Sequence, residues 1–195
     1  MKTQCIIPTV IEKDGAVERA FDIFSRLLKD RIIMINSEID SNLATIVQAQ
    51  LLFLDSESND PINLYINSPG GSVVDGFAIL DTMNLIKSPV HTICVGMAAS
   101  MGAFLLSQGE PGHRYCSENS EIMIHQPLGG FNGQATDIQI HANRILELKD
   151  KLITMMSNST NGIISKEEMF KNCERDNFLS PEKALKMGLI DKIIK

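Results

Sequence analysis

The chain has 195 residues, of which 44% are hydrophobic and 22% charged, and a formal net charge of −6 at pH 7. This size and composition are typical of one globular domain with a sizeable core, and the negative charge without a Lys/Arg cluster argues against a nucleic-acid partner. The longest apolar run, residues 93–106, is interrupted by two glycines and a serine and is shorter than the ~20 residues of a membrane span, so we expect no membrane partner.

The cysteines give no sign of a metal or disulfide framework. They are scattered, without C-x-x-C or metal-ligand spacing, and we expect reduced thiols and no metal at Cys5, Cys94, Cys116 and Cys173. Polar residues and Pro8 follow Met1-Lys2 where a signal peptide would have an apolar segment. We therefore expect a cytoplasmic protein.

The N-terminal residues are expected to form an arm. Residues 1–16 mix apolar and polar side chains around Pro8 and the turn signal Lys13-Asp14-Gly15, so they are either mobile or ordered by a partner. From Val17 onward, helical spacing predicts an amphipathic helix with its apolar face at Phe21, Phe24, Leu27 and Leu28. We divide the chain into an arm, residues 1–20, and a single domain, residues 21–195.

Strands and helices then alternate. Apolar runs predict strands at residues 31–35, 62–67, 90–95, 114–116 and 121–125. Helical patterns lie between them at residues 41–54, at 74–86 and after residue 100. This order predicts an α/β fold with a mostly parallel sheet.

The pattern changes after residue 125. Residues 126–133 are glycine-rich and are expected to be extended, and a long helix is expected from Thr136 to about Met156, with Thr136 and Gln139 as a capping box. This helix either projects from the core toward another subunit or packs on its own sheet. A polar turn at 158–164, a helix at 165–172 and a loop at 173–180 follow, and the last helix begins at Pro181 and ends at Gly188.

Ser100 lies between a strand pattern and a helix pattern, flanked by small residues. A nucleophile needs such a position, because the N–H of Met101 at the helix start would then face an oxyanion. The local sequence has Ala98 where the nucleophile motif G-x-S-x-G has its first glycine. Taken alone, it favours a helix N-cap over a nucleophile.

A hydroxyl nucleophile also needs a base and an orienting acid. His125 is the best of four histidines, because it ends a strand at the rim of the sheet, where ligands bind. The others are expected at a strand start, in a turn and on a solvated helix surface (His91, His113 and His141). Asp176 is one acid among several, and Gly70-Gly71 is either an ordinary turn or the source of a second oxyanion donor.

Five ordered motifs resemble one known family, the Clp serine peptidases (ClpP): YINSPGGSV (65–73), GMAASMGAFLL (96–106), MIHQPLGG (123–130), GQATDI (133–138) and ERDNFLS (174–180). The resemblance implies a crotonase-like α/β fold of repeated strand-strand-helix units, with a projecting handle at about residues 126–163. It implies a catalytic triad of Ser100, His125 and Asp176. It also implies an oxyanion hole of the backbone N–H groups of Gly71 and Met101.

The same resemblance implies how substrates reach the site. An extended peptide would bind along Ser72, Val73, Leu128, Gly129 and Gly130. Two stacked heptameric rings would enclose the active sites, with residues 1–20 as axial loops. An AAA+ unfoldase such as ClpX, ClpA or ClpC would feed unfolded polypeptides into them. The unfoldase would use the ATP, since this chain has no P-loop, and no cofactor is expected here.

Two alternatives stay open. A crotonase-type acyl-CoA enzyme would polarise a thioester with the same N–H groups, without needing a serine beside a histidine. A scaffold subunit of a mixed ClpP assembly would lack a member of the triad, whereas this chain has all three residue types in place.

Overall fold

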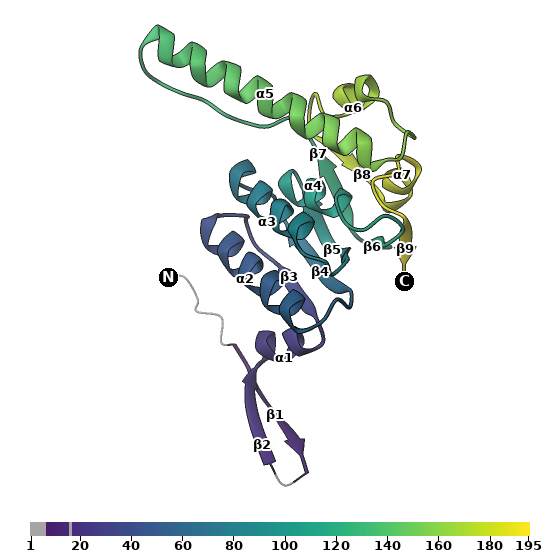
Figure 1. Ribbon diagram of the computed structural model, residues 1–195. Helices are drawn as coiled ribbons and strands as arrows, with labels where there is room; N and C mark the ends of the chain where they lie inside the picture. Colours follow the sequence, from purple (N-terminus) through teal and green to yellow (C-terminus); the bar gives the residue numbers. More distant parts are fainter. Residues whose placement is uncertain (1–6, 16) are drawn as a thin grey trace.

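A computed structural model of the chain describes residues 7–15 and 17–195 (Figure 1). The arm is a two-stranded antiparallel hairpin of β1 (Thr9–Asp14) and β2 (Val17–Asp22), followed by α1 (Ile23–Lys29). The helix predicted from Val17 therefore begins six residues later, so that boundary was wrong. Strand pairing outweighs the helical spacing here, and the Asp22 side chain caps α1 by accepting from the N–H groups of Phe24 and Ser25. The expectations for residues 1–6, including Cys5, lie outside the described residues.

The main sheet has seven strands, and its order confirms the α/β prediction. The path is β3-β4-β5-β6-β9, and β7 pairs with both β5 and β8. Every pairing is parallel except that of β7 with β8. The strands are β3 (Ile32–Ile35), β4 (Ile62–Ser68), β5 (Val90–Ala99), β6 (Arg114–Ser117), β7 (Glu121–Ile124), β8 (Asn177–Leu179) and β9 (Lys192–Ile194).

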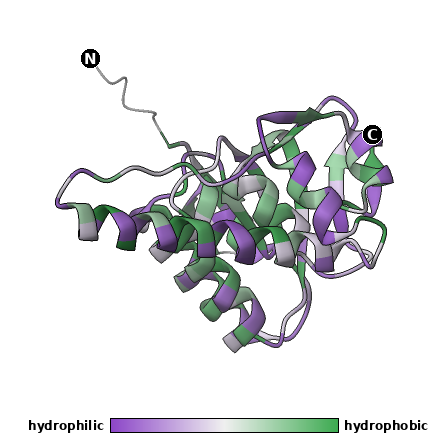
Figure 2. Cartoon of the chain, turned by 90° about the horizontal axis from the view of Figure 1, so that it is seen from above, coloured by the Kyte–Doolittle hydropathy of each residue, from purple (hydrophilic) through white to green (hydrophobic). Residues whose placement is uncertain are grey.

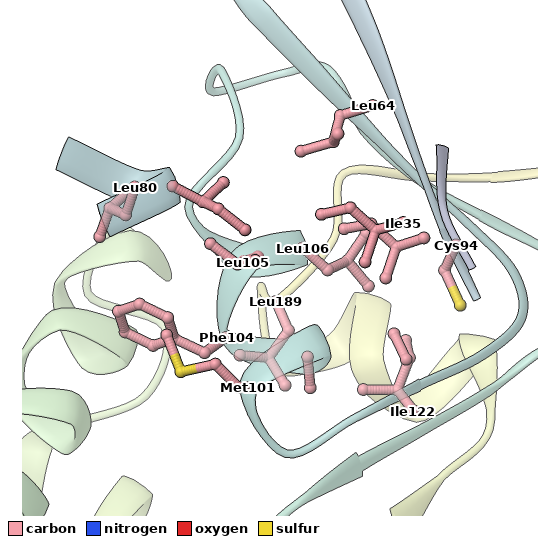
Figure 3. Packing of buried hydrophobic residues seen from close by; sticks show 14 of the residues in the cluster. Ile35, Leu64, Leu80, Cys94, Met101, Phe104, Leu105, Leu106, Ile122 and Leu189 are labelled. Atoms are coloured by element: carbon pink, nitrogen blue, oxygen red, sulfur yellow. The ribbon is translucent and has the colours of Figure 1, made fainter. Parts of the chain in front are cut away.

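Three helices lie side by side against this sheet: α2 (Ser41–Glu57), α3 (Val73–Leu85) and α4 (Met101–Ser107). Every residue of α4 is buried, which explains why its sequence is apolar on all sides. Figure 3 shows Phe104, Leu105 and Leu106 within the core cluster. Leu105 is fully buried, and its replacement by Ala would destabilise the fold by about 2–5 kcal/mol. The N-terminus of α4 therefore has a rigid support.

The long helix α5 (Ala135–Ser159) both packs and projects. Its buried residues all lie in its C-terminal part: Lys149, Ile153, Met156 and Ser157. The N-terminal part extends beyond the sheet, with an extended segment beside it (Figure 1). Seen from above, hydrophobic and hydrophilic residues alternate along the helix (Figure 2). The projecting handle expected at about residues 126–163 corresponds to this unit.

Helix ends differ partly from the prediction. The capping box predicted at Thr136 was wrong, because α5 begins after Gln134 and has no side-chain cap. A capping box does form at the start of α6 (Lys166–Asn172), between Ser165 and Glu168. The predicted last helix is confirmed as α7 (Pro181–Lys186), capped by the Ser180 side chain. Within the described residues, no helix is apolar over a long enough stretch to cross a membrane.

Candidate active site

Ser100 connects β5 to α4 in a strained backbone conformation, with φ of 53° and ψ of −117°. It occupies the N-cap position of α4, but its side chain makes no capping hydrogen bond. The Oγ instead lies 2.7 Å from Nε2 of His125. Strain of this kind costs on the order of 1–3 kcal/mol and persists only where the surroundings impose it. The backbone of Ser100 is held by its N–H, which donates to the Met123 carbonyl at 2.8 Å.

Strand register brings three distant residues together. Ala99 of β5 is opposite Met123 of β7, so the residues that follow these two strands, Ser100 and His125, lie close to each other. Ile124 of β7 is opposite Asn177 of β8, which places Asp176 beside His125. The Asp176 Oδ1 is 3.2 Å from Nδ1 of His125. The His125 side chain is 11% exposed and that of Asp176 is 63% exposed.

The other histidines contact different residues. The rings of His91 and His113 stack on each other at 4.1 Å, and the Nδ1 of His113 is 2.9 Å from the Tyr115 hydroxyl. His141 was expected to be solvated, but its ring stacks on that of Phe131 at 3.7 Å. These histidines therefore have partners of their own, and His125 is the one beside Ser100.

Two backbone N–H groups next to Ser100 have no acceptor among the described residues: those of Gly71 and Met101. Gly71 forms a parallel bridge with Ile39, in which the N–H of Ile39 donates to Gly70 and the N–H of Ser72 donates to Ile39. The N–H of Gly71 then points away from Ile39, because successive residues of a strand face opposite sides. Met101 is the first residue of α4, and first-turn N–H groups have no intrahelical acceptor.

Glycine is required at this close approach. Gly70 has a φ of +98°, and a Cβ there would lie 2.6 Å from the Cβ of Ser100. Gly71 has a φ of +148°, and its Cβ would lie 2.2 Å from the Ile39 carbonyl oxygen. An ordinary turn would not need both glycines. Here they let the backbone at Gly70-Gly71 approach that of Ile39 and of Ser100 closely.

The site opens into a pocket of about 440 Å³. Ser100, His125 and Gly71 line it together with Ser72, Val73 and Leu128, three of the residues expected to contact a substrate. The remaining lining residues are Glu38, Pro69, Val74, Met123, Pro127, Ile145 and Leu148. Gly129 and Gly130 do not line the pocket, and they follow Leu128 along the extended segment. Gly129 faces Ile145 of α5, because a Cβ there would lie 2.6 Å from the Ile145 Cδ1 atom.

The loop that carries Asp176 is tied to α5 by a residue that the sequence did not reveal. The Lys149 ammonium lies 3.1 Å from Glu174 Oε2 and 4.0 Å from the centre of the Phe170 ring. Gln126 Nε2 also donates to the Glu174 carbonyl at 2.8 Å. The sequence feature that could have indicated Lys149 is its position, because it is a charged residue four residues before Ile153, on the buried face of α5. Lys149 and Gln126 together position the loop next to His125.

The described cysteines do not line the pocket and are not placed to act as nucleophiles there. Cys94, Cys116 and Cys173 are free and buried. A hydrogen bond with Cys116, together with burial, raises the pKa of the Cys94 thiol. Burial raises the pKa of the Cys173 thiol to about 11, although the Lys149 ammonium acts in the opposite direction. In residues 7–15 and 17–195, no three side chains of His, Cys, Asp or Glu are grouped so that they could hold a metal ion.

A hydroxyl beside an imidazole, with free N–H groups at the rim of an α/β sheet, is an arrangement typical of hydrolases. The family model described as Clp protease matches residues 15–195. Because the match covers nearly the whole chain, the chain belongs to the Clp protease family and is a Clp-type peptidase.

Proposed function

We propose that the protein is the proteolytic subunit of an ATP-dependent Clp protease, a serine endopeptidase that cuts unfolded polypeptides into short peptides. One observation carries the proposal: Ser100 Oγ is 2.7 Å from His125 Nε2, while Asp176 is next to the other ring nitrogen. A hydroxyl is a weak nucleophile unless a base takes its proton, and this geometry supplies the base and the group that orients it.

The mechanism follows from these positions. Ser100 Oγ attacks the peptide carbonyl while His125 Nε2 takes the hydroxyl proton, and the N–H groups of Gly71 and Met101 bind the resulting oxyanion. His125 then passes the proton to the leaving amine, and an acyl-enzyme on Ser100 is formed. Water, activated by His125, hydrolyses this ester and restores the hydroxyl. Asp176 orients the imidazole of His125 and stabilises the positive charge that the ring carries after it takes the proton.

The pocket is suited to an extended peptide. Ser72 and Val73 would provide one backbone edge, and Leu128 would provide a second one, which Gly129 and Gly130 continue beyond the pocket. A peptide between these edges would be bound mainly through its main chain, which tolerates many side chains. Val74 and Leu148 are among the apolar residues that would receive a side chain next to the scissile bond.

The exposed apolar residues of α5 support assembly. Ile138, Ile140 and Leu146 are 43%, 60% and 62% exposed, although large apolar side chains are usually covered. We propose that α5 joins two heptameric rings into a barrel, with the hairpin of residues 9–22 near its axial pore. An AAA+ unfoldase such as ClpX, ClpA or ClpC would deliver substrates and hydrolyse the ATP.

The alternatives fit less well. An acyl-CoA enzyme of the crotonase type needs the two N–H groups but has no use for the hydrogen bond between Ser100 and His125. An inactive scaffold subunit has no use for an intact triad. Neither alternative explains why Ser100 is held at a positive φ with its hydroxyl directed to an imidazole.

Replacement of Ser100 tests the proposal. Ser100→Ala should abolish hydrolysis of a fluorogenic peptide and of unfolded casein while the native mass stays unchanged. Ser56→Ala is a matched control, because Ser56 is exposed at the far end of α2 and does not line the pocket, and this variant should keep full activity. Turnover by Ser100→Ala above that of a blank would contradict the assignment.

A further inference from the structure

The candidate pocket contains a carboxylate that the proposed mechanism does not use. Glu38 lines the pocket together with Gly71 and Ser100. The other lining residues are apolar or neutral polar, apart from the imidazole of His125. Asp176, the acid behind His125, does not line the pocket. Glu38 is therefore the only carboxylate on the pocket wall among the described residues.

Neighbouring hydrogen bonds fix the backbone of Glu38. On one side, the Ser68 hydroxyl donates to the carbonyl of Ser37 at 2.6 Å. On the other side, the N–H of Ile39 donates to the Gly70 carbonyl at 2.7 Å, and the Ile39 side chain is only 1% exposed. The segment that carries Glu38 is thus bound to the same backbone that presents the N–H of Gly71. The backbone of Glu38 therefore has a defined place relative to Gly71.

The carboxylate of Glu38 is free to bind a substrate. Glu38 is exposed, and among the described residues its side chain takes part in no ion pair or hydrogen bond. Glu12 and Glu174, in contrast, each pair with a basic side chain. An unpaired carboxylate beside a peptide-binding edge attracts a cationic side chain of the peptide and repels an anionic one.

We propose that Glu38 is a specificity-determining residue, which favours peptides with Lys or Arg near the scissile bond and disfavours Asp or Glu there. The inference rests on the proposed peptidase function and refines its substrate class: an extended chain with an apolar residue in the pocket and a basic residue close to it. Exposed ion pairs of this kind change a rate constant by about two- to fivefold. The preference weakens with ionic strength, because salt screens exposed charges.

A set of internally quenched peptides tests the inference. The peptides share an apolar centre and carry Lys, Gln or Glu at one position at a time, from P3 to P3′. In the wild type, Lys should exceed Gln in kcat/KM by about two- to fivefold at the position that faces Glu38, with Glu below Gln. Glu38→Gln should remove this order and Glu38→Lys should invert it, and high ionic strength should weaken both effects.

Glu57→Gln is the matched control. It makes the same change of charge at an exposed residue in the last turn of α2, outside the pocket, so the wild-type preference should persist. The all-neutral peptide shows that each variant is folded and active. If Glu38→Lys loses activity on this peptide, the nearly isosteric Glu38→Gln decides the test.

The outcomes separate the inference from the function on which it rests. Equal Lys-to-Glu ratios in the wild type and in Glu38→Gln, at every position, would overturn the role of Glu38. Hydrolysis of the neutral peptide that depends on Ser100 would still support the peptidase function in that case. If the wild type cleaves none of the peptides, the proposed function fails, and the inference fails with it.

Discussion

Replacement of Gly71 by Ala tests the oxyanion site at a backbone atom. The new Cβ would lie 2.2 Å from the Ile39 carbonyl oxygen, whereas ordinary contact begins near 3.4 Å. The two segments must therefore separate by about 1.2 Å, a shift that also moves the N–H of Gly71. Displacements of ~1 Å at a catalytic group can lower a rate about 100-fold. Loss of one oxyanion donor costs about 2.7–4 kcal/mol in the barrier, or roughly 10²–10³ in kcat.

The fold should survive this change. The positive φ of Gly71 adds a strain of about 1–3 kcal/mol for any other residue, whereas domains of this kind are stable by about 5–15 kcal/mol. Gly112→Ala is the matched control, because Gly112 also has a positive φ, +87°, but open space around its Cβ and no place in the pocket.

The assay is kcat/KM on a fluorogenic peptide, measured beside thermal unfolding and native mass. We expect both glycine variants to lower the melting temperature and only Gly71→Ala to lose activity. A Gly71→Ala variant that stays folded with kcat/KM within threefold of the wild type would refute the assignment of the Gly71 N–H to the oxyanion.

Three further predictions concern other parts of the molecule. Lys149→Met should lower kcat about tenfold by releasing the loop that carries Asp176, and Lys149→Arg should retain most of the activity. Leu146→Asp places a charge on the exposed apolar face of α5 and should reduce the native mass in size-exclusion chromatography. In a Cys5→Ser background, Ellman's reagent at pH 8 should react slowly with the native protein, because the three remaining thiols are buried and the pKa of Cys173 is raised to about 11.

Each of these predictions has an outcome that contradicts it. Equal kcat for Lys149→Met and the wild type would remove Lys149 from the positioning of Asp176. An unchanged mass for Leu146→Asp would exclude this face of α5 from the contact between rings. Rapid labelling of native thiols, at the rate seen after unfolding in guanidinium, would show that the cysteines are accessible. A raised pKa keeps a thiol protonated to higher pH, so labelling of Cys173 should accelerate only as the pH approaches 11.

The residues of the candidate site could be named from the sequence, but the contacts that bring them together could not. Ser100 could be placed between a strand and a helix from local pattern alone, but His125 was one of four histidines and Asp176 one of several acids. Their meeting depends on the register of β7 against β5 and β8. β8 has only three residues, too few for a periodic pattern, so the segment was predicted to be a loop. The family motifs, and not the periodicity, pointed to these three residues together.

The strands and helices that bury one face or all of their side chains in the core were predicted well. The strands at β3, β4 and β5 and the helices at α2 and α3 lie within a few residues of their predicted positions. The hairpin was missed because β2 is almost entirely exposed and runs directly into α1, so the helical spacing of Phe21 and Phe24 masked it. Lys149 was missed because a charged residue within an apolar stripe is ordinarily expected to be solvated. Its partner, Glu174, is 25 residues away in the sequence, and only the fold shows that the two side chains pair.

Labelling with a fluorophosphonate tests the central claim most directly, because the reagent reacts with a serine only when a base activates its hydroxyl. Peptide mapping should find the adduct on Ser100, and Ser100→Ala should lose it. His125→Ala should react much more slowly. An active preparation that remains unlabelled at Ser100, or is labelled at another serine, would contradict the account.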